Sequence, residues 1–402
     1  MNVVPSPAQR RNPYPFYAAM RQSNPVAYDE RAGFWGVYCY EDVRQVLTNH
    51  DTFSSDRTRL MTGRDPNVLE QVRVGSSLLG SDPPRHRLLR DLISRAFTPR
   101  AVAQLEPRIA EITNALLDAV IPGRQMDFIA DLAYPLPVTV IAEMLGVPSS
   151  DRPTFKRWAD ALVGGTDEIP TDVTSPEVAK RLRLQQEMAE YFRATVEERR
   201  RAPTNDLISA LVAAEVEGQR LSEADILAFC NVLLLAGHVT TTNLLGNAIV
   251  CLLDQPDQHA LLRQNLALVP SAVEEVLRYE GPVQAIARVV ATDTTLGGQR
   301  LAAGQRILAW IGSADRDETV FAEPDRFDVT RHPNPHLAFG LGIHFCLGAP
   351  LARLEGRVAL SIVLSRLRNL ALAEPAPLEW ATSAFLRGLT RLPLRFEASA
   401  AA

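Results

Sequence analysis

The stretch of ten residues from 339 to 348 constrains this chain more than any other part of its sequence. It is FGLGIHFCLG, with one cysteine, Cys346, among the glycines Gly340, Gly342 and Gly348. Glycine gives the backbone access to positive φ and lets it approach a flat ligand closely. A lone cysteine is commonly a buried structural residue, but this full pattern favours a metal ligand.

The sequence after the cysteine strengthens that interpretation. Leu351, Leu354, Val358 and Ile362 repeat at helical spacing and predict a helix at about 349–367. Cys346 stands just before this helix, whose positive N-terminal end favours a thiolate. A single thiolate ligand points to haem iron.

Composition excludes several other classes of protein. The 402 residues show no linker or repeat, so we expect one domain over 1–402. Acids and bases are mixed along the chain at a net charge of −5, which argues against nucleic-acid binding. The four cysteines lack metal-ligand spacing, and the N-terminus resembles neither a signal peptide nor a membrane anchor. We expect a cytoplasmic monomer.

Periodicity and helix breakers predict a mainly α fold with small β-sheets. A long helix is expected from Ser222 to about 255, and its polar residues mark it as a core helix and not a membrane span. The β-richer part is expected at about 1–60 and 283–312. The other expected elements are strands at 25–28 and 34–38, helices at 101–120 and 133–145, and two charged helices within 151–201.

The decapeptide resembles the haem-binding loop of the cytochrome P450 family, in its soluble bacterial class. This resemblance implies haem b, with Cys346 as the iron ligand and Phe339, Gly340 and Gly348 as part of the cofactor-binding loop. It also implies a P450-like domain, with haem between the long central helix and the helix that follows the cysteine.

A second motif of that family is Glu275-x-x-Arg278. Residues three apart are neighbours on a helix, although alone such a pair is usually a solvated ion pair. In the family it is a structural core pair, completed by a basic residue that Arg331 matches. Four residues match the positions that hold the haem propionates: His86, Arg90, Arg288 and His344.

The long helix carries Ala236-Gly237-His238-Val239-Thr240, which resembles the family's oxygen-binding segment. Thr240 is the matching proton-delivery residue, and Gly237 would leave room for oxygen. The acid that relatives carry before the threonine is Val239 here. Three alternatives stay open: delivery through Thr240 and water, aided by His238 or the substrate; an atypical oxidation chemistry; or a catalytically impaired haem-binding recruitment module.

Substrate contacts come from the resemblance alone. The residues expected to line the pocket are Val283, Gln284, Ile286, Phe385 and Leu386. A lid is expected at 164–175. The loop arginines Arg57, Arg59 and Arg73 suggest a substrate carboxylate or an acidic carrier protein, although a solvated loop is the simpler interpretation.

The sequence thus predicts a haem-thiolate monooxygenase that inserts one atom of O₂ into a lipophilic small molecule by hydroxylation or epoxidation. A bacterial natural product such as a polyketide, in secondary metabolite biosynthesis, is the preferred substrate class. Electrons would come from a ferredoxin or flavodoxin with its reductase, with Arg95, Arg353 and Arg357 as guesses for the docking face. A helical protein without haem is the remaining rival.

Overall fold

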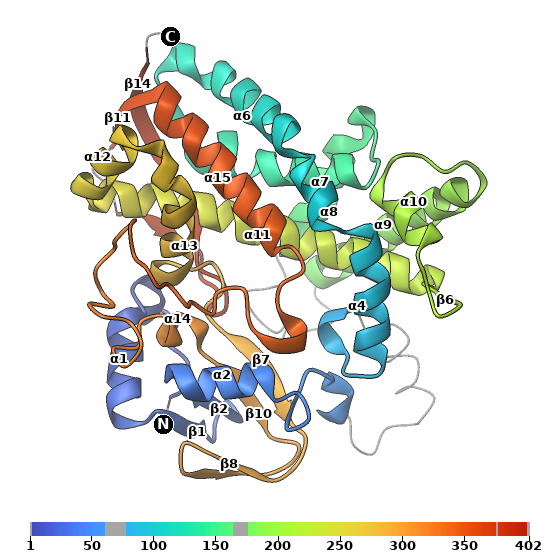
Figure 1. Cartoon of the computed structure of the whole chain (residues 1–402), viewed down its shortest axis with the longest axis vertical. Coiled ribbons are helices and arrows are strands. Elements are labelled where there is room, and N and C mark those ends of the chain that lie inside the picture. The colour runs from blue at the N-terminus through green and yellow to red at the C-terminus, as the bar shows by residue number, and fades with distance from the viewer. Residues whose placement is uncertain (1, 61–77, 164–175, 375–376, 400–402) are drawn as a thin grey trace. The chain divides into compact units, whose positions relative to one another are not determined.

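The computed structural model describes residues 2–60, 78–163, 176–374 and 377–399 (Figure 1). The chain is mostly helical with small sheets, as the sequence predicts. It divides into two compact units. Unit 1 comprises Met1–Ser55, Leu105–Leu136 and Thr240–Ala402, and unit 2 comprises Asp56–Gln104 and Pro137–Val239.

Unit 1 contains a five-stranded sheet in the order β1-β2-β10-β7-β3. β10 runs parallel to β2, and the other neighbours are antiparallel. Trp35 and Ile307 on its strands pack with Val43 and Leu47 of α2 (Tyr40–Thr48) in one apolar core. The strands are β1 (Val26–Asp29), β2 (Phe34–Val37), β3 (Phe53–Ser54), β7 (Ile286–Val290) and β10 (Arg306–Ala309).

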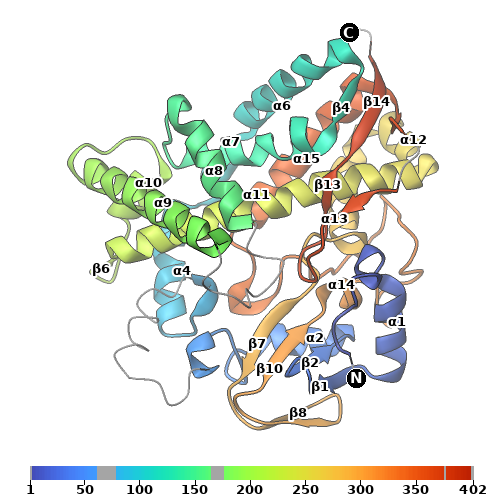
Figure 2. The same cartoon turned by 180° about the vertical axis from the view of Figure 1, so that it is seen from behind.

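The helices of unit 1 pack against one another, and its C-terminal strands belong to a second, smaller sheet. α6 (Glu106–Val120) and α15 (Ala349–Arg366) run side by side (Figure 1), and α13 (Val269–Tyr279) also contacts α15. Figure 2 shows β14 (Pro393–Ala398) next to β4 (Gln125–Asp127), in a small sheet completed by β11 (Leu367–Leu372). The remaining elements are α1 (Tyr14–Ser23), α12 (Pro256–Gln264), α14 (Ile311–Ala314), β8 (Thr294–Leu296), β9 (Gln299–Leu301), β12 (Glu379–Trp380) and β13 (Leu389–Arg391).

Unit 2 consists of helices and, between α10 and α11, a short β-hairpin. Aromatic side chains of α8 (Arg152–Val163) and α9 (Pro176–Arg201) meet edge to face, with the Phe155 and Phe192 rings 6.4 Å apart. Such pairs stabilise beyond the area that they bury. The other elements are α4 (Arg85–Ala96), α5 (Pro99–Ala103), most of α7 (Pro135–Met144), α10 (Leu207–Ala213), β5 (Glu215–Val216) and β6 (Gln219–Arg220).

The predicted long helix is α11 (Glu223–Asp254), with 32 residues. The Ser222 hydroxyl accepts from the Asp225 N–H at 3.2 Å and Asp225 accepts in return from the Ser222 N–H at 3.0 Å, which caps the start of the helix. By length and composition α11 could span a membrane. Its buried Asn247 amide instead donates to the carbonyls of Glu280 and Arg387, which identifies a core helix.

The prediction of a single helix at 101–120 is wrong. The structure has α5 and α6 there, separated at Gln104 and Leu105. Pro107 lacks an N–H and fits the first turn of a helix, so α6 begins one residue before it. The helix expected at 133–145 is α7, and a π-helical turn at Ile129–Ala133 precedes it.

Candidate functional site

Residues 339–348 form a tight loop that leads into α15. The Cys346 N–H donates to the Phe339 carbonyl at 2.9 Å and closes the loop. Gly340 and Gly342 have φ of 68° and 69°, a region that favours glycine. Cys346 is half-buried and lies three residues before Ala349, the first residue of α15. The loop presents one thiol at a helix N-terminus, as the sequence predicts.

One glycine of this loop, Gly342, lies close against the backbone of α2. A Cβ at Gly342 would lie 3.1 Å from the Leu47 carbonyl oxygen at the end of α2. A Cβ at Gly348 would lie 3.9 Å from the Cys346 sulfur. Gly342 therefore lets the loop approach the end of α2 closely, whereas a side chain at Gly348 would meet the sulfur at ordinary contact distance.

Glu275 and Arg278 form a fully buried ion pair on α13. Two Arg278 nitrogens donate to the two carboxylate oxygens, each at 2.8 Å. Arg331 joins them, because its Nε donates to Glu275 at 3.1 Å. The backbone N–H of Asp328 and the Asn334 amide also donate to Glu275. Unpaired, these charges would be expensive to bury, so the cluster is a structural core.

A neighbouring network was not anticipated from the sequence. Glu274, beside Glu275, accepts two hydrogen bonds from Arg353 of α15 at 2.7 and 2.8 Å, and it contacts His336 Nε2 at 3.0 Å. The Arg353 guanidinium carbon lies 4.4 Å from the centre of the Phe339 ring. Glutamates are common on helices and no spacing distinguishes this one, so the sequence carried no signal for it.

The residues predicted to hold propionates lie in both units. In unit 1, Arg288 is a buried residue of β7 opposite Ile307 of β10, and half-buried His344 ends the 3-10 turn of the cysteine loop. In unit 2, His86 is buried and Arg90 half-buried one turn further along α4. The types of donor suit carboxylates, and their role stays a prediction.

Three of the motif residues near the middle of α11 are not fully buried. Ala236 is exposed, and Gly237 and Thr240 are half-buried, whereas Leu234 and Leu244 next to them are buried. A Cβ at Gly237 would meet the Ile141 Cδ1 of α7 at 2.7 Å. Packing against α7 therefore accounts for glycine at position 237. The predicted space for oxygen beside Gly237 is a separate point and stays a prediction.

His238 is poorly suited to the proton delivery suggested for it. Its ring is buried, and burial lowers its pKa, so the ring is neutral. Its Nδ1 bonds the Leu234 carbonyl of its own helix, which requires the proton to be on Nδ1. Val239 is buried as well and has no titratable group.

Glu355 is a candidate acid that the sequence did not reveal. It lies on α15, is 1% exposed, and burial raises its pKa from 4.5 to about 8, against a smaller opposing effect of a hydrogen bond with Thr241. Among the residues that the structure describes, its Oε1 finds no hydrogen-bond partner. Thr241 follows Thr240 in α11, so this chain has a buried proton-holding carboxyl next to the segment that is predicted to bind oxygen.

Two segments expected to line the substrate pocket meet in unit 1. Val283 pairs with Leu386 in an antiparallel bridge, and the Gln284 N–H donates to the Phe385 carbonyl at 2.8 Å. Phe385 is 37% exposed, which leaves its ring accessible to a ligand. Ile286 begins β7.

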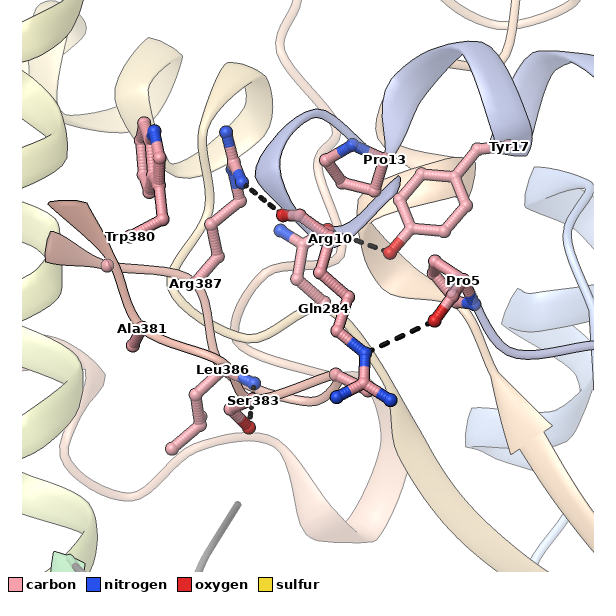
Figure 3. A pocket seen from close by; sticks show the side chains of 12 residues that line it. Pro5, Arg10, Pro13, Tyr17, Gln284, Trp380, Ala381, Ser383, Leu386 and Arg387 are labelled. Atoms are coloured by element: carbon pink, nitrogen blue, oxygen red, sulfur yellow. Dashed lines mark hydrogen bonds between the residues drawn. The ribbon is translucent and has the colours of Figure 1, made fainter. Parts of the chain in front are cut away.

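Gln284 was predicted to be the polar residue of that pocket, and the structure gives its amide another place. It donates to the Gly281 carbonyl at 2.8 Å and accepts from the Tyr17 hydroxyl at 3.1 Å. It lies, with Arg10 and Arg387, in a small pocket lined by the N-terminal segment (Figure 3). Both polar ends of the amide are bonded there, and a contact of Gln284 with the substrate stays a prediction.

Two of the arginines predicted to bind the electron donor are already paired within the chain. Arg353 and Arg357 are held in two-point ion pairs with Glu274 and Glu106, so neither is a free docking charge. Arg95 and Arg59 are exposed. Arg73, the lid at 164–175 and the side chain of Arg57 lie outside the described residues.

Comparison with known proteins identifies the family. The cytochrome P450 family profile matches residues 27–387. Cyclomarin C epoxidase CymV of Salinispora arenicola is 44% identical, covering 86% of this chain and 87% of its own. Erythromycin C-12 hydroxylase of Saccharopolyspora erythraea is 40% identical, with 92% and 91% covered. The crystal structure of CYP109E1 from Bacillus megaterium with corticosterone matches at a TM-score of 0.87 and 40% identity, covering 96% and 99%.

The chain belongs to the cytochrome P450 family. It is a monooxygenase that uses haem b. Its residues fit that cofactor, because a single thiol stands in a glycine loop, with a buried arginine and a histidine in the same unit. These are the donor types that an iron ion and two carboxylates need. Cys346 would hold the iron, and Arg288 and His344 would meet carboxylates.

Proposed function

We propose that this P450 hydroxylates or epoxidises a lipophilic small molecule and tailors a bacterial natural product such as a polyketide. The names of two relatives, an epoxidase acting on cyclomarin C and an erythromycin hydroxylase, support this class. A related structure holds a steroid, which supports a substrate of similar apolar character. Bound haem supplies the activation of O₂, and the protein supplies orientation and protons.

The observation that carries the proposal is the closed cysteine loop, in which Cys346 is tied to Phe339 at the start of α15. The β-bridge between Val283 and Leu386 brings apolar side chains together for a lipophilic molecule. An apolar site with few polar groups suits such a ligand.

We propose that Glu355 supplies the proton-holding group that Val239 cannot. The carboxyl is buried, bonds Thr241 and has a pKa of about 8, so it keeps its proton near neutral pH. Thr240 and its neighbour Thr241 would pass protons between this carboxyl and the oxygen site. Glu355→Gln should then lower the amount of product formed per NADPH consumed.

The activity is tested with NADPH, a surrogate ferredoxin and its reductase, and a panel of macrolides, cyclic peptides and steroids. Product carrying one atom of ¹⁸O from ¹⁸O₂ supports a monooxygenase. Haem binding without product across the panel would favour the recruitment module. Oxidised product without incorporated oxygen would favour an atypical oxidation.

The native electron donor is proposed to be a ferredoxin or flavodoxin with its reductase, and the enzyme to be a cytoplasmic monomer. The exposed Arg95 is the remaining candidate of the three predicted docking residues. Arg95→Glu should slow electron transfer from an acidic ferredoxin, and the effect should weaken at high salt because exposed charges are screened. Sedimentation tests the oligomeric state.

A further inference from the structure

Two adjacent glutamates of α13 have different surroundings. Glu275 is fully buried in the structural core, whereas the side chain of Glu274 is 30% exposed. Glu274 joins three segments of unit 1, because its carboxylate holds Arg353 of α15 and His336 from the segment before the cysteine loop. It therefore lies at the junction of α13, α15 and the start of the cysteine loop.

Both partners of Glu274 contact Phe339. The Arg353 guanidinium carbon lies 4.4 Å from the centre of the Phe339 ring, and the His336 ring centre is 6.1 Å away. The Ala338 N–H donates to His336 Nδ1 at 3.3 Å, so the ring proton is on Nε2 and is donated to Glu274. Arg353 and His336 are thus both oriented by one carboxylate.

Phe339 connects this cluster to the sulfur. Its carbonyl oxygen accepts the Cys346 N–H at 2.9 Å, and its ring lies 6.4 Å from the ring of Phe345, the residue before the cysteine. Groups outside a metal's own ligands orient those ligands and tune the metal, and hydrogen bonding near the sulfur is one such control.

We propose that Glu274 is a positioning residue for Cys346. By holding Arg353 and His336 it fixes Phe339, and Phe339 in turn fixes the backbone that carries the thiolate. The proposal assumes that Cys346 is the iron ligand. It assigns to Glu274 a function that its neighbour Glu275, bonded to Arg278 and Arg331, does not share.

The charge state of Glu274 suits this role. Burial alone would raise its pKa, but the hydrogen bonds from Arg353 and His336 outweigh burial and lower the pKa to about 2. The carboxylate therefore stays charged, and its bonds to Arg353 persist, over the whole range in which such an enzyme works.

The chain offers a matched control. One helical turn further along α15, Arg357 makes an equivalent two-point pair with Glu106, at 3.0 and 2.9 Å. The exposures are also similar, 38% for the Arg353 side chain and 40% for that of Arg357. What distinguishes Arg353 is its position over Phe339.

The experiment compares Glu274→Gln, Arg353→Lys and Glu106→Gln in the haem-loaded protein. Three quantities are measured: the rate of haem transfer to apomyoglobin, the reduction potential, and the fraction of the reduced carbon monoxide complex with the thiolate-type band. Glu274→Gln and Arg353→Lys should speed haem loss about 10-fold and change the other two quantities, since the loss of groups that orient a metal ligand typically costs about 10–100-fold in metal affinity. Glu106→Gln should change none.

Equal effects of Glu274→Gln and Glu106→Gln on all three quantities would overturn the proposal and leave two ordinary ion pairs. If Glu274→Gln does not fold, Arg353→Lys, which keeps the charge but lacks the planar stacking group, decides in the same way. A wild-type protein without the thiolate-type band would contradict the assignment of Cys346 itself, and a normal wild type with silent variants would contradict Glu274 alone.

Discussion

The cysteine loop and the middle of α11 carry the two most specific motifs of this chain, but they are held very differently. The residues around Cys346 are tied by polar contacts to distant segments, such as Glu275 to Arg331 and Glu274 to Arg353. In α11, His238 bonds its own helix and Gly237 packs on Ile141. The cysteine side therefore depends on long-range polar contacts within unit 1, so we expect the larger effects from variants on that side.

The first prediction concerns the buried ion pair of α13. Arg278→Ala should lower the free energy of unfolding by about 3–5 kcal/mol, because it leaves Glu275 buried without its main partner. Urea unfolding measures the loss. Arg326→Ala is the control, since Arg326 makes an exposed pair with Glu323 worth about 0–1 kcal/mol. Similar losses in both variants would contradict the structural role.

The second prediction separates backbone strain from contact in the cysteine loop. Gly342→Ala should cost about 2–3 kcal/mol, because alanine disfavours a φ of 69° and its methyl group would meet the Leu47 carbonyl. Gly298→Ala shares the positive φ but meets nothing within 4 Å, so it should cost about 1 kcal/mol. Thermal unfolding gives both values. Equal costs would show that the contact with α2 is unimportant.

Much of this architecture could be predicted, because it follows from local patterns. The 32 residues of α11, its Ser222 cap and the paired strands near the N-terminus all rest on periodicity and turn residues. The break at Gln104 agrees with Pro107, which fits the first turn of a helix. The apolar periodicity continues across the break, so periodicity alone predicts a single helix there.

The contacts that could not be predicted join residues far apart in the chain. Glu274 meets Arg353 across 79 residues, and Tyr17 meets Gln284 across 267. Glu355 has no local signal either, because its pKa depends on the helices that bury it. The motif around Cys346 was accessible since its residues are consecutive.

The third prediction uses the pKa of Glu355. Burial raises that pKa from 4.5 to about 8. Between pH 4.5 and about 8 the folded protein therefore keeps a proton that the unfolded chain has lost. Stability from this group is present at low pH and lost as the pH rises through about 8. Relative to wild type, Glu355→Gln should gain stability from pH 5 to 8, by up to about 1.4 kcal/mol per pH unit. A difference that does not vary with pH would refute it.

The fourth and smallest effect is expected at Val239. Val239→Glu introduces the acid that the family resemblance leads us to expect, so it should change the yield of product per NADPH about two- to tenfold. This is below the roughly 10²–10⁴-fold range of general acid–base catalysis, because the wild type already has another route for protons. Val239→Gln controls for size at this buried position. If the yield is the same in all three proteins, an acid at position 239 is irrelevant to proton delivery here.

The central claim is that Cys346 is the thiolate ligand of a haem. The most direct measurement is the absorption spectrum of the reduced protein under carbon monoxide, for wild type and Cys346→Ala. The account predicts the strongly red-shifted Soret band of a thiolate-ligated haem in the wild type, and no such band in the variant. A wild type without the band, or a variant that keeps it, would contradict the claim.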